Sequence, residues 1–166
     1  MTISKEYELV YEGKEEEENL LANTVAIPLQ EVRTFGQKYF LNEANWSNML
    51  IFGDNLAVLK TLMNNSDIKG KVRLVYIDPP FSTDQDFRSG SSRVSTISSS
   101  LEDQIAYQDT LVGAEYLEFL RERLIFLREL LANDSSIYVH IDWKKGHYVK
   151  VLMDEIFGEE HFVNDI

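Results

Sequence analysis

The sequence has 166 residues, of which 44% are apolar and 27% are charged, and it contains no cysteine. This composition fits one globular domain, and it excludes a disulfide-stapled secreted scaffold and a thiolate metal site. The apolar runs fall far short of the ~18 residues that a membrane span needs. The N-terminus has neither an apolar signal core nor an Arg-rich transit pattern, so we expect a cytoplasmic protein without a membrane partner.

The charge balance is strongly acidic. Sixteen basic residues against 28 acidic residues give a formal net charge of −12 and a pI near 4.6. By itself this argues against nucleic acid as a partner, because phosphate contacts are built from Lys and Arg. A local basic groove or a second domain could still supply those contacts, so the sign of the net charge does not decide the question.

Residues 1–45 have the character of an N-terminal extension. The run Glu15–Glu18 is typical of a solvated face, and residues 25–40 mix apolar side chains with Pro28 and Gly36 without a clean period. We expect this segment to pack across the main domain rather than to fold alone.

From residue 46 the pattern becomes regular. Residues 48–52 form a short apolar run closed by Gly53-Asp54, and leucines at helical spacing follow it up to Met63. Residues 72–77 form a second apolar run, rich in β-branched and aromatic residues. The pattern predicts strand, turn, helix and strand, with both strands buried.

The second half of the chain continues the alternation. A serine-rich stretch at 89–100 has the composition of a mobile loop, and an i, i+3/i+4 stripe over 116–131 predicts a long amphipathic helix. Residues 136–141 read as a third strand, and residues 149–157 as a second amphipathic helix ended by Gly158. Alternating strands and helices predict an α/β fold with a parallel sheet.

Aspartates stand where each of the three predicted strands ends, namely Asp54, Asp78 and Asp142. In parallel sheets ligands bind at the carboxyl ends of the strands. Asp78 opens the tetrapeptide Asp78-Pro79-Pro80-Phe81, in which the prolines fix the backbone and remove its N–H donors. The sequence therefore predicts a rigid site that is rich in hydrogen-bond acceptors.

Such a site suits a planar group that carries an exocyclic amine. Phe81 would stack on the ring, while the Asp78 carboxylate and the Pro79 carbonyl accept the two amine hydrogens. The lone pair of a nucleobase amine is delocalised, and two acceptors favour a more tetrahedral nitrogen that can attack the methyl group of a sulfonium. The alternative is a plain proline turn with Phe81 covering the core, but this tetrapeptide arises by chance on the order of once in several hundred sequences of this size.

The stretch IDPPF, with LIFGDNLAVLKTL upstream and SIYVHID downstream, resembles the amino-methylating DNA methyltransferases. The resemblance is to the adenine-N6 modification subunits of type III restriction systems, and it covers residues 46–166 and, weakly, YELVYEGK. It implies a Rossmann-like fold and methyl transfer from S-adenosylmethionine to an adenine flipped out of duplex DNA. The residues it assigns to catalysis are Asp78, Pro79, Pro80 and Phe81.

The resemblance also implies a cofactor segment at Gly53-Asp54-Asn55, where such enzymes place an acidic residue near the cofactor adenine. Asp54 could instead cap a helix, or do both. The family's glycine-rich F-x-G-x-G turn and its target-recognition segment have no counterpart in the sequence. We therefore expect residues 46–166 to form a partial catalytic domain, inactive alone, whose missing half supplies the basic DNA surface.

Several alternatives stay open. The amine could belong to cytosine N4 rather than adenine N6, or to a protein glutamine or an RNA base, and the chain could be a non-catalytic acidic module that docks a partner protein. The resemblance suggests double-stranded DNA, a helicase-nuclease restriction subunit and a second copy of the chain as partners. His140, Asp142 and His147 are too loosely spaced to predict a metal site.

Overall fold

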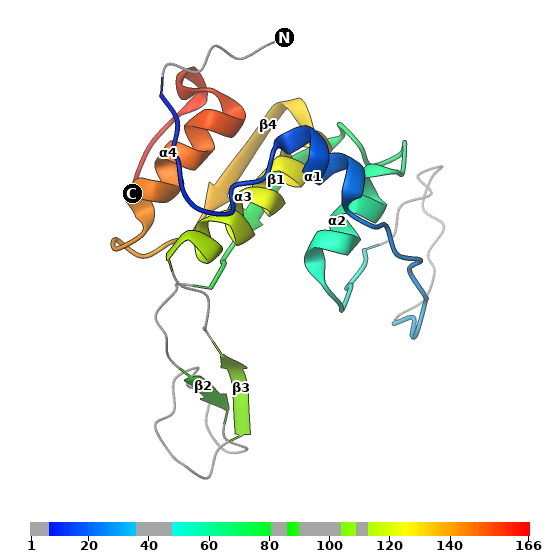
Figure 1. Cartoon of the computed structure of the whole chain (residues 1–166). Helices are drawn as coiled ribbons and strands as arrows, with labels where there is room; N and C mark the ends of the chain where they lie inside the picture. Colours follow the sequence, from blue (N-terminus) through cyan, green and yellow to red (C-terminus); the bar gives the residue numbers. More distant parts are fainter. Residues whose placement is uncertain (1–6, 36–47, 81–85, 90–103, 109–112) are drawn as a thin grey trace.

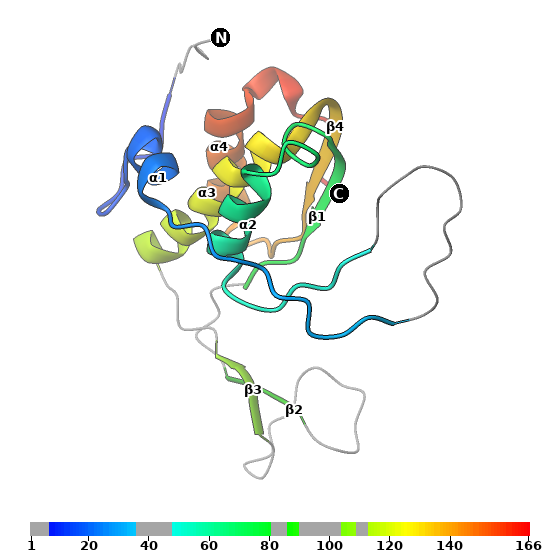
Figure 2. The ribbon, with the colours of Figure 1, turned by 90° about the vertical axis from the view of Figure 1, so that its right-hand side faces the viewer.

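The computed structural model describes residues 7–35, 48–80, 86–89, 104–108 and 113–166. At its centre two parallel strands pair, β1 (Val72–Ile77) and β4 (Leu131–Val139). Figures 1 and 2 show the helices α2 (Asn55–Met63), α3 (Gly113–Leu130) and α4 (Gly146–Phe157) together on one side of this pair. The parallel pairing, with helices between the strands in sequence, confirms the predicted α/β fold.

The two faces of the β1–β4 pair have different surroundings. On the face toward the helices Val75 is 8% exposed, and Ile77, Ile137 and Val139 pack against the core. On the other face Leu74, Tyr76 and Tyr138 are 62%, 67% and 54% exposed. The prediction that residues 72–77 form a buried strand is therefore wrong for one of the strand's two faces.

Residues 48–52, predicted as a buried strand, belong to neither a helix nor a strand. Leu50 and Phe52 are fully exposed, at 99% and 102%. A strand needs a neighbour that takes its backbone hydrogen bonds, and within the described part of the chain β1 pairs with β4 alone. Apolar composition without such a neighbour does not make a strand, so this prediction is wrong.

The core lies between α3 and α4. The largest fully buried side chains come from these two helices: Tyr116, Leu120, Leu124, Ile125, Phe126, Val149 and Leu152. Tyr116, Leu120 and Leu124 follow the spacing of the predicted stripe. Ile125 and Phe126 lie outside that stripe, so α3 is buried on more than the one predicted face. Helix α4 ends at Gly158, whose φ of 96° suits glycine, as predicted.

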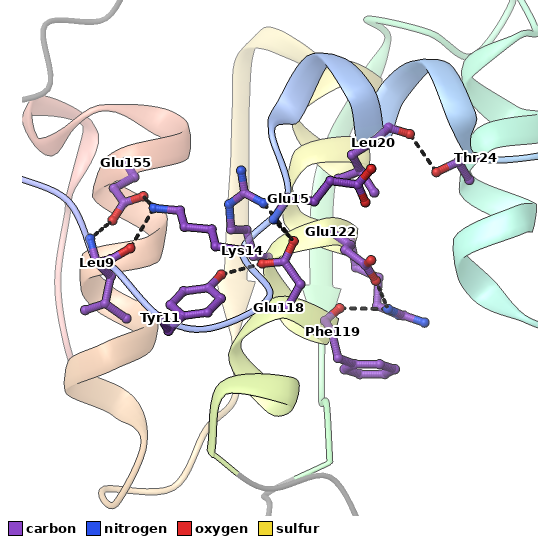
Figure 3. Close-up of polar contacts among 12 residues, drawn as sticks. Leu9, Tyr11, Lys14, Glu15, Leu20, Thr24, Glu118, Phe119, Glu122 and Glu155 are labelled. Carbon is purple, nitrogen blue, oxygen red and sulfur yellow. Dashed lines mark hydrogen bonds and ion pairs between the residues drawn. The ribbon is translucent and has the colours of Figure 1, made fainter.

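The N-terminal extension packs against the helices, and it contains a helix that the sequence did not predict, α1 (Glu17–Asn23), whose Leu20 joins the core. Figure 3 shows Tyr11 donating a hydrogen bond to Glu118 of α3 (2.6 Å) and Lys14 bonding Glu155 of α4 (2.9 Å). Farther along, the Ile27 backbone bonds the Thr61 hydroxyl of α2. The predicted packing across the domain is thus seen, while the predicted boundary near residues 45 and 46 lies outside the described residues.

A second, antiparallel strand pair joins β2 (Asp86–Ser89) to β3 (Gln104–Gln108). Tyr107 lies in β3 and pairs with Phe87 of β2. Most of the predicted loop at 89–100 lies outside the described residues. After α4 the chain forms one turn of 3-10 helix, η1 (Glu159–His161). Among the described residues, no helix combines the length and the apolar character needed to cross a membrane.

Candidate active site

Parallel strands bring the ends of β1 and β4 to the same edge of the sheet. Ile77 lies beside Val139 in the register, and the His140 backbone N–H donates to the Ile77 carbonyl (2.9 Å). The next residue of each chain segment is therefore Asp78 on one side and His140 on the other. Both are placed by backbone hydrogen bonds of the sheet and not by a flexible loop.

The side chains of these two residues contact each other. His140 Nδ1 lies 2.9 Å from Asp78 Oδ1, and both side chains are a little more than half exposed. An ionised carboxylate only accepts hydrogen bonds, so Nδ1 carries the proton of this contact. The contact engages Oδ1 of the carboxylate, and Oδ2 is a second acceptor on the same side chain.

Two prolines continue from this aspartate. Pro79 and Pro80 are half-buried, and neither has a backbone N–H to donate. We call Asp78 and these two prolines the acceptor-rich corner, and the role in amine binding that the sequence predicts for it stays a prediction. Phe81, the predicted stacking residue of the tetrapeptide, lies outside the described residues.

Asp54 is the N-cap of α2, because its Oδ1 accepts the Leu56 backbone N–H (3.1 Å). Gly53, at a φ of 154°, makes the turn that leads into it. The Asp54 carboxylate stays 68% exposed. Capping therefore uses Asp54 Oδ1, while the other carboxylate oxygen of Asp54 and the exposed Asn55 amide remain accessible at the start of the helix.

Arg123, a residue that the sequence analysis did not single out, reaches this turn from α3. Its Nε donates to Asn55 Oδ1 (2.7 Å), and its Nη2 lies 3.7 Å from Asp54 Oδ1. Burial lowers the pKa of Arg123, while the charges of Glu122 and Asp54 act in the opposite direction. An arginine near the middle of a long amphipathic helix gives no sign in the sequence of its contact 68 residues away.

Asp142, the third predicted strand-end aspartate, has a structural role in the turn before α4. Its carboxylate accepts the backbone N–H groups of Lys144 (3.1 Å) and Lys145 (3.2 Å). The sheet edge thus brings Asp78 and His140 together, and the α2 turn joins Asp54 and Asn55 to Arg123. Both views of the ribbon place the end of β1 and the start of α2 toward the same, lower end of the domain (Figures 1 and 2).

Comparison with known proteins covers the part of the chain that contains β1, the acceptor-rich corner and β4. Residues 72–166 match the family described as DNA methylase. The chain belongs to this family. The match begins at the first residue of β1 and includes the corner at Asp78-Pro79-Pro80.

Individual relatives point the same way. The chain is 42% identical to the type II methyltransferase M.EcaI of Enterobacter cloacae over 118 residues. These residues make up 70% of the chain and 23% of M.EcaI. Over 99% of the chain it is 35% identical to the Mod subunit of the type III restriction-modification enzyme EcoP15I of Escherichia coli, of which it covers 27%. The Mod subunit of StyLTI from Salmonella typhimurium is 31% identical over 86% of the chain, which is 22% of that subunit. The chain spans about a quarter of the length of these curated relatives.

Proposed function

We propose that this DNA methylase chain carries the catalytic corner of an S-adenosylmethionine-dependent, restriction-modification type methyltransferase that modifies adenine N6. The observation that supports this most directly is the Asp78 carboxylate at the end of β1, held through Oδ1 by His140 and followed by two prolines. A fixed acceptor with no neighbouring N–H donors is what an exocyclic amine requires.

The chain's own residues bind and orient the amine. Asp78 Oδ2 and the Pro79 carbonyl accept its two hydrogens, and Phe81 stacks on the base once it has left the duplex. Two acceptors on one nitrogen favour a tetrahedral geometry, which frees the lone pair to form the new nitrogen–carbon bond. The nitrogen would take the methyl group as the carbon–sulfur bond of the sulfonium breaks, which leaves a neutral thioether, and the methylated amine would then release one proton to solvent.

Asp54 and Asn55 fit the cofactor by their chemistry. They present a carboxylate acceptor and an amide donor side by side at the start of α2, toward the same end of the domain as the end of β1. The cofactor, when bound, supplies an electrophilic methyl group on a sulfonium. The residues at the α2 turn would bind and orient its adenosine part.

Adenine N6 is preferred over cytosine N4 because of the resemblance to type III adenine modification subunits. The relatives are named as Mod subunits of restriction-modification enzymes, which supports a restriction subunit and double-stranded DNA as partners. A homodimer and a cytoplasmic location belong to the same proposal. The enzyme class is favoured over a non-catalytic acidic module by the fixed geometry at Asp78.

The test is methyl transfer from labelled S-adenosylmethionine to unmethylated genomic DNA, using the gene product that contains residues 1–166. We expect N6-methyladenine among the hydrolysed nucleosides, and Asp78→Asn should lower the rate on the order of a hundredfold or more, because one acceptor becomes a donor. Asp134→Asn is the matched control, since this exposed aspartate pairs with Arg73 away from the corner and should leave the rate unchanged.

Each other outcome rejects a defined part of the proposal. N4-methylcytosine as the product would replace adenine by cytosine, and label in RNA or protein would replace the class of acceptor. An Asp78→Asn enzyme as fast as the unsubstituted one would remove the corner from catalysis.

A further inference from the structure

Arg123 is held in one position by contacts in several directions. Its side chain is 13% exposed. Besides the bond from Nε to Asn55, its Nη1 donates to the Phe119 carbonyl (2.7 Å) and to Glu122 Oε2 (3.2 Å). The guanidinium carbon also lies 3.5 Å from the centre of the Phe119 ring, an arginine–aromatic stack. Figure 3 shows Phe119 and Glu122 on α3, where these contacts are made.

This fixed guanidinium sets the orientation of the Asn55 amide. An arginine has donors and no acceptor, so the Asn55 oxygen must face it and the Asn55 NH₂ group must face away. The neighbouring Asp54 carboxylate is held through its Oδ1, which accepts the Leu56 N–H and lies near the same guanidinium. As a result an amide donor and a carboxylate acceptor are presented together at the α2 turn, in an orientation set from α3.

We propose that Arg123 is the positioning residue of the cofactor turn, Gly53–Asn55, and raises affinity for S-adenosylmethionine by fixing Asp54 and Asn55 before binding. This rests on the proposed function, because it assumes that the cofactor turn contacts the cofactor. Pre-ordering these side chains removes an entropy cost that binding would otherwise include. A lysine keeps the charge but lacks the planar fork, so it cannot donate to Asn55 and Phe119 in the same way.

The experiment is calorimetric titration of S-adenosylmethionine into the gene product that contains residues 1–166, in a double-mutant cycle of Arg123→Lys and Asn55→Ala. We expect each single variant to bind about tenfold more weakly and the double variant to fall well short of a hundredfold loss, because Arg123 donates directly to Asn55 and only approaches Asp54 to 3.7 Å. In turnover assays the KM for the cofactor should rise while the KM for DNA stays the same. Arg123→Gln, which retains one donor group, serves as a second variant in case Arg123→Lys folds poorly.

The matched control is Arg128→Lys. Arg128 is also a partly buried arginine of α3, but it lies five residues farther along the helix and pairs with Glu17 of α1 and with Glu129. Loss of a structural ion pair alone would lower the stability of both variants, whereas loss of positioning should weaken cofactor binding only at Arg123.

The outcomes separate this inference from the proposed function. If Asn55→Ala weakens binding but Arg123→Lys does not, or if the two losses multiply to about a hundredfold, Arg123 is not the positioning residue. If the unsubstituted protein fails to bind S-adenosylmethionine, or if neither Asp54→Ala nor Asn55→Ala changes its affinity, the proposed cofactor site is wrong and this inference is wrong with it.

Discussion

Two neighbouring carboxylates of α4 tie the N-terminal extension to the domain. Asp154 accepts hydrogen bonds from the Tyr7 hydroxyl (2.9 Å) and from Lys150 (2.5 Å). Glu155, with a side chain only 3% exposed, bonds the Leu9 backbone N–H and the Lys14 ammonium. A buried carboxylate is stable only when charged or polar partners surround it. These residues therefore connect the extension to α4 through hydrogen bonds and an ion pair.

The Tyr7 contact predicts a specific loss of stability at alkaline pH. The hydrogen bond to Asp154, followed by burial, raises the pKa of Tyr7 from 10.0 to about 12. A raised folded-state pKa gives stability that is fully present below pH 10 and is lost as the pH rises through 12. In urea unfolding from about pH 9 to about pH 12, Tyr7→Phe should show a smaller loss than the unsubstituted chain.

The control for this experiment is Tyr138→Phe, on the exposed face of β4. Tyr11, whose pKa is also raised by burial and by Glu118, remains in both variants. The informative quantity is thus the difference between the chains. Identical pH profiles for Tyr7→Phe and the unsubstituted chain would mean that the Tyr7–Asp154 bond does not persist in solution.

For single residues, the sequence indicated those that lie within one short motif. It did not indicate residues such as Arg123, whose contacts are with residues far away in the sequence. Asp54 as a helix cap follows from its neighbours, because it lies two residues before the N–H it accepts. The Asp78–His140 and Arg123–Asn55 contacts join residues 62 and 68 positions apart. Those contacts depend on which strands pair and how two helices pack, and local spacing does not contain that information. The roles of Asp78, Pro79, Pro80 and Phe81 in catalysis stay predictions.

The elements themselves were predicted well where an amphipathic stripe was long. Helix α3 begins three residues before the start of the predicted stripe and ends one residue before the end of the stripe. The helix as a whole supplies most of the core, although only part of its buried residues belong to the stripe. The short apolar runs at 48–52 and 72–77 were less informative, because runs of five and six residues are too short for a period that tells a strand buried on one face from a strand buried on both. Helix α1 was missed since its glutamates look like a solvated face, although Leu20 among them is buried.

The difference between the two faces of β1 is testable with neighbouring residues. Val75→Thr places a hydroxyl in the core and should cost about 1–3 kcal/mol of unfolding free energy. Tyr76→Thr, one residue along on the exposed face, should change that free energy by no more than about 0.5 kcal/mol. Threonine suits strands, so β propensity is kept in both variants. Urea unfolding followed by circular dichroism measures both.

The comparison can also fail in an informative way. If Tyr76→Thr costs as much as Val75→Thr, the face with Leu74, Tyr76 and Tyr138 is covered in solution. Dependence of the unfolding midpoint on protein concentration would then identify a second copy of the chain as the cover.

For the molecule as a whole, the net charge of −12 opposes the approach of a polyanion, while the proposed reaction takes place on DNA. The acidic charge and a reaction on DNA are compatible if residues 1–166 contain the catalytic residues and another part of a longer enzyme contains the DNA-binding surface. The relatives are consistent with such a division, because the chain spans about a quarter of their length. Affinity for DNA is then a property of the assembly and not of this chain.

This division predicts the behaviour of residues 1–166 prepared alone. Non-specific DNA binding by basic proteins has a Kd of about 10⁻⁴ to 10⁻⁶ M at physiological salt and weakens steeply as salt rises, because bound counterions are released. An acidic chain releases few counterions, so fluorescence anisotropy with a labelled duplex should give a Kd weaker than about 10⁻⁴ M and almost no salt dependence. Tight binding with a steep salt slope would instead place a basic groove within these residues. Arg88 and Arg93 are the first candidates for such a groove, since they are the charged residues of the serine-rich stretch 87–101. Loss of the salt dependence in the double variant Arg88→Ala with Arg93→Ala would assign the groove to them.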